Sequence, residues 1–196
     1  MRRLFNILIP ALVLTVMISV LPFYNSCQEL YDDVLRIHIL ANSDSAADQS
    51  LKLAVRDRVV SECSAWYDDC VGKESAMETT AAHLSDIESA AHDEILSRGF
   101  DYSVRAELGE AYFNTRYYDD FTMPAGRYDA LRLYIGEGEG GNWWCVLYPA
   151  LCVGSACGDI PEDSFSDGEY RVVTSDRTEF RFWIVEWFEG LLDLFR

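Results

Sequence analysis

Basic residues are scarce in this chain of 196 residues. Lysine and arginine together number 16, against 33 aspartates and glutamates, which gives a formal net charge of -17 at pH 7. A protein with this balance is repelled by the phosphates of nucleic acid and of anionic lipid. The composition therefore predicts no nucleic-acid partner and disfavours peripheral attachment to anionic membranes. We attribute most of the acidity to solubility.

Signatures of phosphate and metal binding are also missing. The glycine-rich stretch 136–142 lacks the Gly-Lys-Ser/Thr ending of a phosphate-binding loop, and it carries Glu137 and Glu139 where an anion would lie. These carboxylates match no known calcium loop, and the cysteines and histidines are not spaced like zinc ligands. His83 and His92 lie off the apolar stripe of their predicted helix and are interpreted as surface residues. We predict no cofactor, no metal site and no small-molecule substrate.

The N-terminal segment predicts export. Arg2 and Arg3 precede an apolar run over residues 4–21, which is close to the shortest length that spans a bilayer. Basic residues ahead of such a run hold the N-terminus inside and send the rest of the chain across the membrane. Bulky residues follow the run where a cleavage site needs small ones, so a cleaved signal peptide and a retained anchor both fit residues 1–26. A lipoprotein modified at Cys27 fits poorly.

A strand, a polar turn and a capped helix are predicted next. Residues 34–40 alternate like a half-buried strand, with Arg36 and His38 on the face opposite the apolar residues. The turn that follows contains Asn42 and Asp44, and Ser45 opens the helix with a capping box. His38, Asn42 and Asp44 are therefore expected at one rim, which we predict to be a partner-binding surface.

The remaining pattern predicts one extracytoplasmic α+β domain over residues 27–196. Helices are expected over about 45–66 and 75–98, the second beginning at Ser75, and further strands over 102–108, 128–135 and 143–148. This order predicts two to three helices packed on a largely antiparallel sheet.

An amphipathic helix is predicted to end the domain, over about residues 177–196. Its wide apolar stripe contains Trp183, Ile184, Trp187 and Phe188 and has to be covered by something. We expect it to pack on the domain's own sheet, with a partner or a membrane surface as the alternatives. Its acidic residues argue against a helix that spans the bilayer.

The strand over 143–148 begins with two tryptophans and a cysteine. Trp143 and Trp144 point to opposite faces, so one is expected to fill the core and the other to face a partner. A disulfide between Cys145 and Cys152 is predicted because the proline between them breaks the strand, with two small buried thiols as the alternative.

Cys145 also suggests a rival hypothesis. With His38 as the base and Asn42 or Asp44 orienting it, this thiol would suit an extracytoplasmic cysteine hydrolase acting on peptide or cell wall. The weakness is that a cysteine in mid-strand lacks the helix N-terminus that commonly lowers the pKa of a reactive thiol.

Two stretches, residues 36–57 and 123–152, closely resemble the stage II sporulation protein R family. The resemblance implies a secreted or membrane-anchored signalling protein, made in the forespore and exported into the intermembrane space between the two cells. There it would trigger a membrane-embedded aspartic protease that processes the pro-sigma-E precursor, with no established catalytic residue of its own. Glu139 and Ala150 depart from the family pattern, which has a basic residue and a proline there, and they affect only details of the loop.

Overall fold

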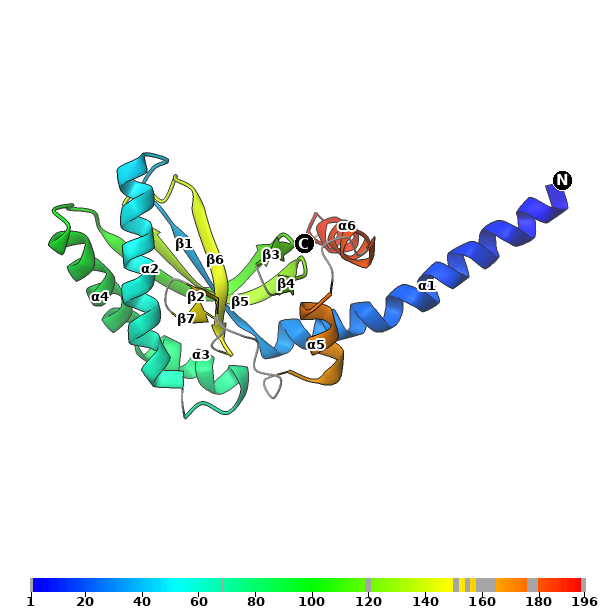
Figure 1. The fold of residues 1–196 in the computed structure, drawn as a ribbon, viewed down its shortest axis with the longest axis horizontal. Coiled ribbons are helices and arrows are strands. Elements are labelled where there is room, and N and C mark those ends of the chain that lie inside the picture. The colour runs from blue at the N-terminus through cyan, green and yellow to red at the C-terminus, as the bar shows by residue number, and fades with distance from the viewer. Residues whose placement is uncertain are drawn as a thin grey trace. The chain divides into compact units, whose positions relative to one another are not determined.

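The computed structural model describes residues 2–67, 69–118, 121–149, 152–153, 156–157, 165–175 and 180–194. It divides into two compact units (Figure 1). The sheet unit comprises residues 32–112 and 127–160, and the N-terminal unit comprises residues 1–31, 113–126 and 161–196. The predicted division into residues 1–26 and 27–196 stays a prediction. The first helix, α1 (Arg2–Asp33), runs through that boundary without a break.

The sheet unit is built on four strands in the order β2-β5-β1-β6. They are β1 (Leu35–Leu40), β2 (Val104–Phe113), β5 (Gly126–Ile135) and β6 (Asn142–Tyr148). β1 is parallel to β5 and antiparallel to β6, so the sheet is mixed. A two-stranded pair, β7 (Cys152–Val153) with β8 (Ala156–Cys157), follows β6 in the chain.

Three helices belong to the same unit: α2 (Ala46–Tyr67), α3 (Gly72–Ala82) and α4 (Leu84–Ser97). α2 and α3 contact β1, and α4 packs against α2. The prediction of helices packed on a sheet is confirmed. The second predicted helix is, however, two helices divided at His83, and Ser75 is not a capping residue because α3 already begins at Gly72.

The core of the sheet unit lies between the helices and one face of the sheet. Leu35, Ile37 and Ile39 of β1 are all fully buried there. Each such side chain contributes about 1.5–3 kcal/mol when removed from water. The helices supply the matching residues, which are Leu51, Val55 and Val59 of α2 together with Ile87 and Ile95 of α4.

The N-terminal unit contains α1, the short hairpin β3 (Arg116–Tyr117) with β4 (Thr122–Met123), α5 (Asp167–Val173) and α6 (Phe180–Asp193). α1 and α6 pack through aromatic pairs, with ring centroids 5.1 Å apart for Phe23 and Phe182. α5 begins at a capping box in which the Ser166 hydroxyl accepts from the backbone N–H of Glu169.

The predicted C-terminal helix exists, and within its own unit it packs on α1. The expectation that it packs on the sheet stays a prediction. The described contacts of its buried face are with α1, and the buried residues are Phe182, Val185 and Glu189. Trp183 and Trp187, from the predicted packing stripe, are exposed instead. The helix is apolar around most of its circumference, so periodicity alone does not identify the side that packs.

Candidate partner-binding surface

The sheet face opposite the helices is accessible near the end of β1. His38 stands opposite Trp144 of β6 on one side and Arg132 of β5 on the other. Its imidazole stacks on the Trp144 indole with ring centroids 5.3 Å apart and an interplanar angle of 17°. His38 Nε2 lies 2.9 Å from Asn142 Oδ1. Both stacked side chains are half-buried, so a partner has access to them.

Charged and aromatic side chains extend this surface across β5 and β2. The Arg132 guanidinium pairs with the Glu107 carboxylate at 3.2 Å, and Glu107 also pairs with Arg105. The Arg105 guanidinium lies 4.2 Å from the centroid of the Tyr134 ring. We define the open sheet face by five half-buried residues: His38, Leu40, Arg132, Tyr134 and Trp144. Aromatic and arginine side chains are the types that most often dominate the energy of protein interfaces.

The same face is closed at the beginning of β1. Arg36, expected on the polar side of a half-buried strand, is fully buried, and its guanidinium lies 4.9 Å from the centroid of the Tyr128 ring. Ala130 and Val146, which flank Arg36 in the sheet, are also fully buried. The strand is therefore covered on both faces at one end and open only at the other.

The turn after β1 is held by the buried carboxylate of Asp48, the third residue after Ser45 in the predicted capping box. Asp48, only 4% exposed, accepts hydrogen bonds through Oδ2 from Ser43 Oγ at 2.6 Å and from Asn42 Nδ2 at 2.9 Å. These two hydrogen bonds, from Ser43 first, hold the pKa of Asp48 below its usual value. The predicted helix cap is present, since the backbone N–H of Asp48 donates to Ser45 Oγ at 3.1 Å.

The same turn also holds the glycine-rich loop over residues 136–142 in place. Asn42 Oδ1 accepts from the backbone N–H of Glu137 at 3.1 Å, and Asp44 Oδ1 accepts from that of Gly141 at 2.6 Å. The chain passes so close that a Cβ on Gly140 would lie 2.2 Å from the backbone oxygen of Ser43. Asn42 and Asp44 thus fix the loop beside the open sheet face.

Lys52 of α2 also binds the glycine-rich loop, from the buried side of that loop. Its ammonium group donates to the Gly141 carbonyl and to Gln49 Oε1, both at 2.7 Å, and the side chain is 5% exposed. Burial lowers the pKa of Lys52, while the Asp44 carboxylate opposes that shift. Lys52 is buried because the glycine-rich loop folds over it and accepts a hydrogen bond from its ammonium group.

The two tryptophans do point to opposite faces. Trp143 is opposite Ile39 and stacks under the guanidinium of Arg56 from α2, at 5.2 Å. It therefore belongs to the helical side, whereas Trp144 belongs to the open sheet face. The expectation that one of them fills the core is wrong, since both indoles are half-buried.

The cysteine-hydrolase arrangement is not assembled. Cys145 is fully buried and disulfide-bonded, so it carries no free thiol. It is opposite Ile37 in the sheet and so faces away from His38. The side chain of Cys152 lies outside the described residues, and its pairing with Cys145 stays a prediction. Of the other described cysteines, Cys63 is a buried free thiol whose pKa is raised to about 12 by burial.

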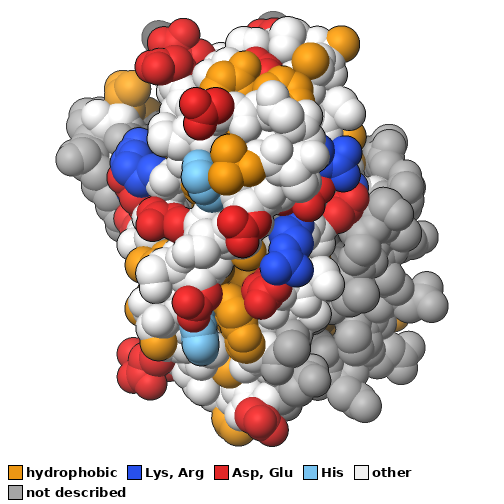
Figure 2. Space-filling view, turned by 90° about the vertical axis from the view of Figure 1, so that its left-hand side faces the viewer, with side chains coloured by type: hydrophobic (Ala, Val, Ile, Leu, Met, Phe, Trp, Pro, Cys, Tyr) orange, Lys and Arg blue, Asp and Glu red, His pale blue; other side chains and the backbone are white. Residues whose placement is uncertain are grey.

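The part of the chain that the structure describes contains no assembled set of metal ligands. Within those residues no group of three or more histidine, cysteine and acidic side chains is close enough to hold an ion. The side of the molecule that carries α4 shows acidic side chains spread among a few basic ones and no broad basic patch (Figure 2).

Among the described residues, one helix is long and apolar enough to cross a membrane, judged by length and composition. The candidate span is the part Ile7–Asp33 of α1, and only 7% of its most apolar window is buried. This agrees with the predicted signal or anchor segment.

The fold and the site define a mixed α/β protein with an apolar N-terminal helix and an exposed aromatic and charged sheet face. The chain belongs to the stage II sporulation protein R family, whose model matches residues 31–157. It is similar to Stage II sporulation protein R of Bacillus subtilis strain 168, with 32% identity over 183 residues covering 82% of each chain. No solved structure matches it. The predicted resemblance is confirmed, and with it a role in sporulation.

Proposed function

We propose that this protein is an intercellular sporulation signal that works by binding and has no catalytic centre. In this proposal it is exported from the forespore into the intermembrane space, where it activates a membrane-embedded aspartic protease and so leads to processing of pro-sigma-E. Family membership and the apolar N-terminal helix support this assignment. The observation that carries it is the accessible stack of His38 on Trp144, held near the open end of β1, a strand that is buried on both faces at its other end.

Activation by binding needs a difference in affinity between two receptor states. A ligand that binds both states equally shifts nothing, and moving a receptor from 1:99 to 99:1 takes about 5.5 kcal/mol of preference for the active state. A surface with two or three aromatic and arginine side chains can supply this when it contacts only the active state, because truncating an individual hot-spot residue costs about 2–4 kcal/mol. The open sheet face contains Trp144, Tyr134 and Arg132 in that role.

The proposed contact residues divide into two groups. His38 and Trp144 contact the receptor directly, whereas Asn42 and Asp44 act by positioning the loop over 136–141, to which both are hydrogen-bonded. Trp143 lies on the helical side and serves as a matched control on the same strand.

The experiment measures association of the full chain, reconstituted in nanodiscs, with the exported portion of the protease. We expect Trp144→Ala to weaken binding by at least about tenfold, which corresponds to about 1.4 kcal/mol, and Trp143→Ala to leave it nearly unchanged. Circular dichroism confirms that both variants fold. Equal effects of the two substitutions, or none from either, would refute this choice of surface.

A cysteine hydrolase acting on peptide or cell wall is the rival, and the buried disulfide at Cys145 disfavours it. Cys145→Ser separates the two hypotheses in cells. If pro-sigma-E processing stops while the variant still folds and still binds the protease, the result favours the cysteine-hydrolase hypothesis over the signalling proposal.

A further inference from the structure

The C-terminal helix α6 has a second apolar face that no described part of its unit covers. Trp183 is 73% exposed, Trp187 62%, Leu191 39% and Leu194 81%. Spaced four, four and three residues apart, the first three form one stripe along the helix, and Leu194 extends it just past the helix end. The opposite side is buried against α1 through Phe182 and Val185. An exposed stripe of two tryptophans and two leucines is unusual for a surface that faces only water.

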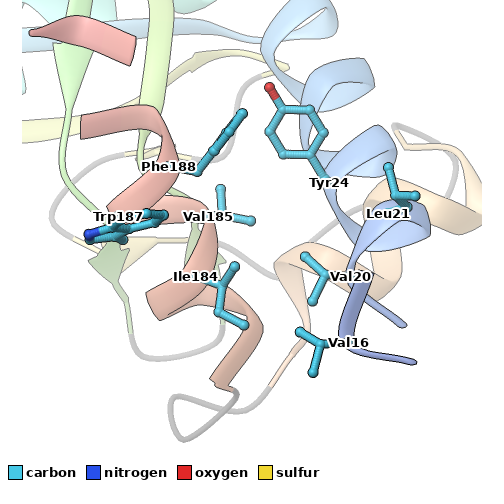
Figure 3. A pocket seen from close by; sticks show the side chains of 8 residues that line it. All are labelled: Val16, Val20, Leu21, Tyr24, Ile184, Val185, Trp187 and Phe188. Carbon is cyan, nitrogen blue, oxygen red and sulfur yellow. The ribbon is translucent and has the colours of Figure 1, made fainter. Parts of the chain in front are cut away.

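The stripe is continuous with the apolar surface of α1. A cavity of about 260 Å³ separates the two helices, and all eight side chains that line it are apolar or aromatic (Figure 3). α1 contributes Val16, Val20, Leu21 and Tyr24, and α6 contributes Ile184, Val185, Trp187 and Phe188. Further along α1, Ile7, Leu14 and Ile18 are each more than half exposed. The two helices therefore present one apolar surface, part of it on the helix that is long enough to span a bilayer.

Polar groups mark where this surface ends. The buried Glu189 carboxylate of α6 accepts hydrogen bonds from Tyr24 at 3.1 Å and from Gln28 at 3.2 Å, both on α1. Arg171 and Arg181 line a shallow pocket with Pro22 and Phe23, at the point where the apolar run of α1 gives way to polar residues. If residues 4–23 occupy the hydrocarbon layer, these groups lie at the depth of the lipid headgroups, where tryptophan is also enriched.

We propose that α1 is retained as an anchor and that α6 lies flat in the membrane interface beside it. The occupant of the exposed stripe is the lipid bilayer: Trp183, Trp187, Leu191 and Leu194 are buried among headgroups and upper acyl chains. A helix of 14 residues is too short to span the bilayer, and its acidic residues favour the interface. With a net charge of -17, attachment depends on apolar burial and works on zwitterionic lipid. This inference rests on the proposed export and anchoring.

Retention of α1 follows from the packing of α6. Cleavage near residue 26 would remove Phe23 and Tyr24, which pack edge to face on Phe182 and Phe188 of α6. The freed helix would then expose apolar residues on both sides. The N-terminal segment is, on this account, a structural part of the mature protein.

Tryptophan quenching by brominated lipid tests the position of α6. The full chain is reconstituted into phosphatidylcholine vesicles that carry bromine near the headgroup end of the acyl chains. We expect quenching in the natural chain and loss of most of it when Trp183→Phe and Trp187→Phe are combined, because phenylalanine keeps the apolar contact but removes the fluorophore. Trp66→Phe and Trp143→Phe, both in the sheet unit, are the matched controls. Each removes one emitter but should leave unchanged the absolute intensity that bromine quenches.

Three outcomes would overturn the inference. They are quenching that persists in the double variant, an absence of quenching in the natural chain, and chemical cross-links between α6 helices showing that a second copy covers the stripe. Retention of α1 is tested separately by the intact mass of protein recovered from forespore membranes, where a chain beginning near residue 27 would contradict it. Pro-sigma-E processing is assayed in parallel. If pro-sigma-E is processed normally but α6 does not contact lipid, only this inference is refuted. If α6 contacts lipid but the chain does not bind the protease, only the signalling proposal is refuted.

Discussion

Replacement of Asp48 by asparagine should loosen the turn that joins β1 to α2. The Asp48 carboxylate accepts two hydrogen bonds, from Ser43 and Asn42, in an almost fully buried position. A hydrogen bond to a charged group contributes about 1.5–3 kcal/mol, and asparagine keeps the shape and one acceptor oxygen but loses the charge. We therefore expect a loss of about 2 kcal/mol in the free energy of unfolding.

Urea unfolding of the full chain in detergent micelles, followed by tryptophan fluorescence, measures this loss. With a urea dependence of about 2 kcal/mol per molar, the midpoint should fall by about 1 M. Asp57→Asn is the control, because the Asp57 side chain is 49% exposed and pairs only with neighbouring Arg56 in the described structure. Its effect should stay below about 0.5 kcal/mol.

The difference between the natural chain and Asp48→Asn should also depend on pH. The pKa of Asp48 in the folded protein lies below its usual value of 3.8, so below that value the unfolded chain binds more protons. The stabilisation is fully present above about pH 5 and is lost as the pH falls through the folded pKa. The two midpoints should therefore converge in acid. A difference that stays constant down to pH 2, or no difference at pH 7, would refute this account of the turn.

Further predictions use the same unfolding assay. Gly140→Ala should destabilise by at least about 2 kcal/mol, since its Cβ would lie 2.2 Å from a backbone oxygen, whereas Gly109→Ala, with its nearest atom at 3.9 Å, should be tolerated. Tyr67→Phe should cost about 1 kcal/mol because the hydroxyl is 2.7 Å from Thr80 Oγ1 in the core. A reductant should lower stability by about 2–4 kcal/mol through the disulfide of Cys145, and Cys145→Ser should abolish that response.

Much of the sheet unit could be predicted because its signals are local. The alternation over residues 34–40 and the Ser45 cap fixed β1 and the start of α2 to within a residue or two. Capping patterns were less reliable elsewhere. Ser75 matches the same pattern but lies inside α3, whereas Ser166, which the sequence analysis passed over, caps α5. The pattern shows that a cap is chemically possible, and tertiary packing decides which one forms.

The candidate site was only partly predictable because long-range contacts decide its shape. The rim was expected from His38, Asn42 and Asp44, but nothing local indicated that two of these would be hydrogen-bonded to a loop almost a hundred residues later in the chain. Arg132 was missed as a surface residue because its place beside His38 depends on the parallel pairing of β1 with β5. Parallel pairs lack the hairpin turn that makes antiparallel neighbours recognisable in a sequence.

The position of β1 in the sheet has a consequence for biogenesis. This strand emerges early from the ribosome, yet both of its neighbours, β5 and β6, are encoded far downstream. Sheets closed by such distant pairings have high contact order and form slowly. If the chain is exported as we propose, it would still lack its central β-structure when it reaches the membrane, and it would therefore remain in the unfolded form that passage through a narrow channel requires.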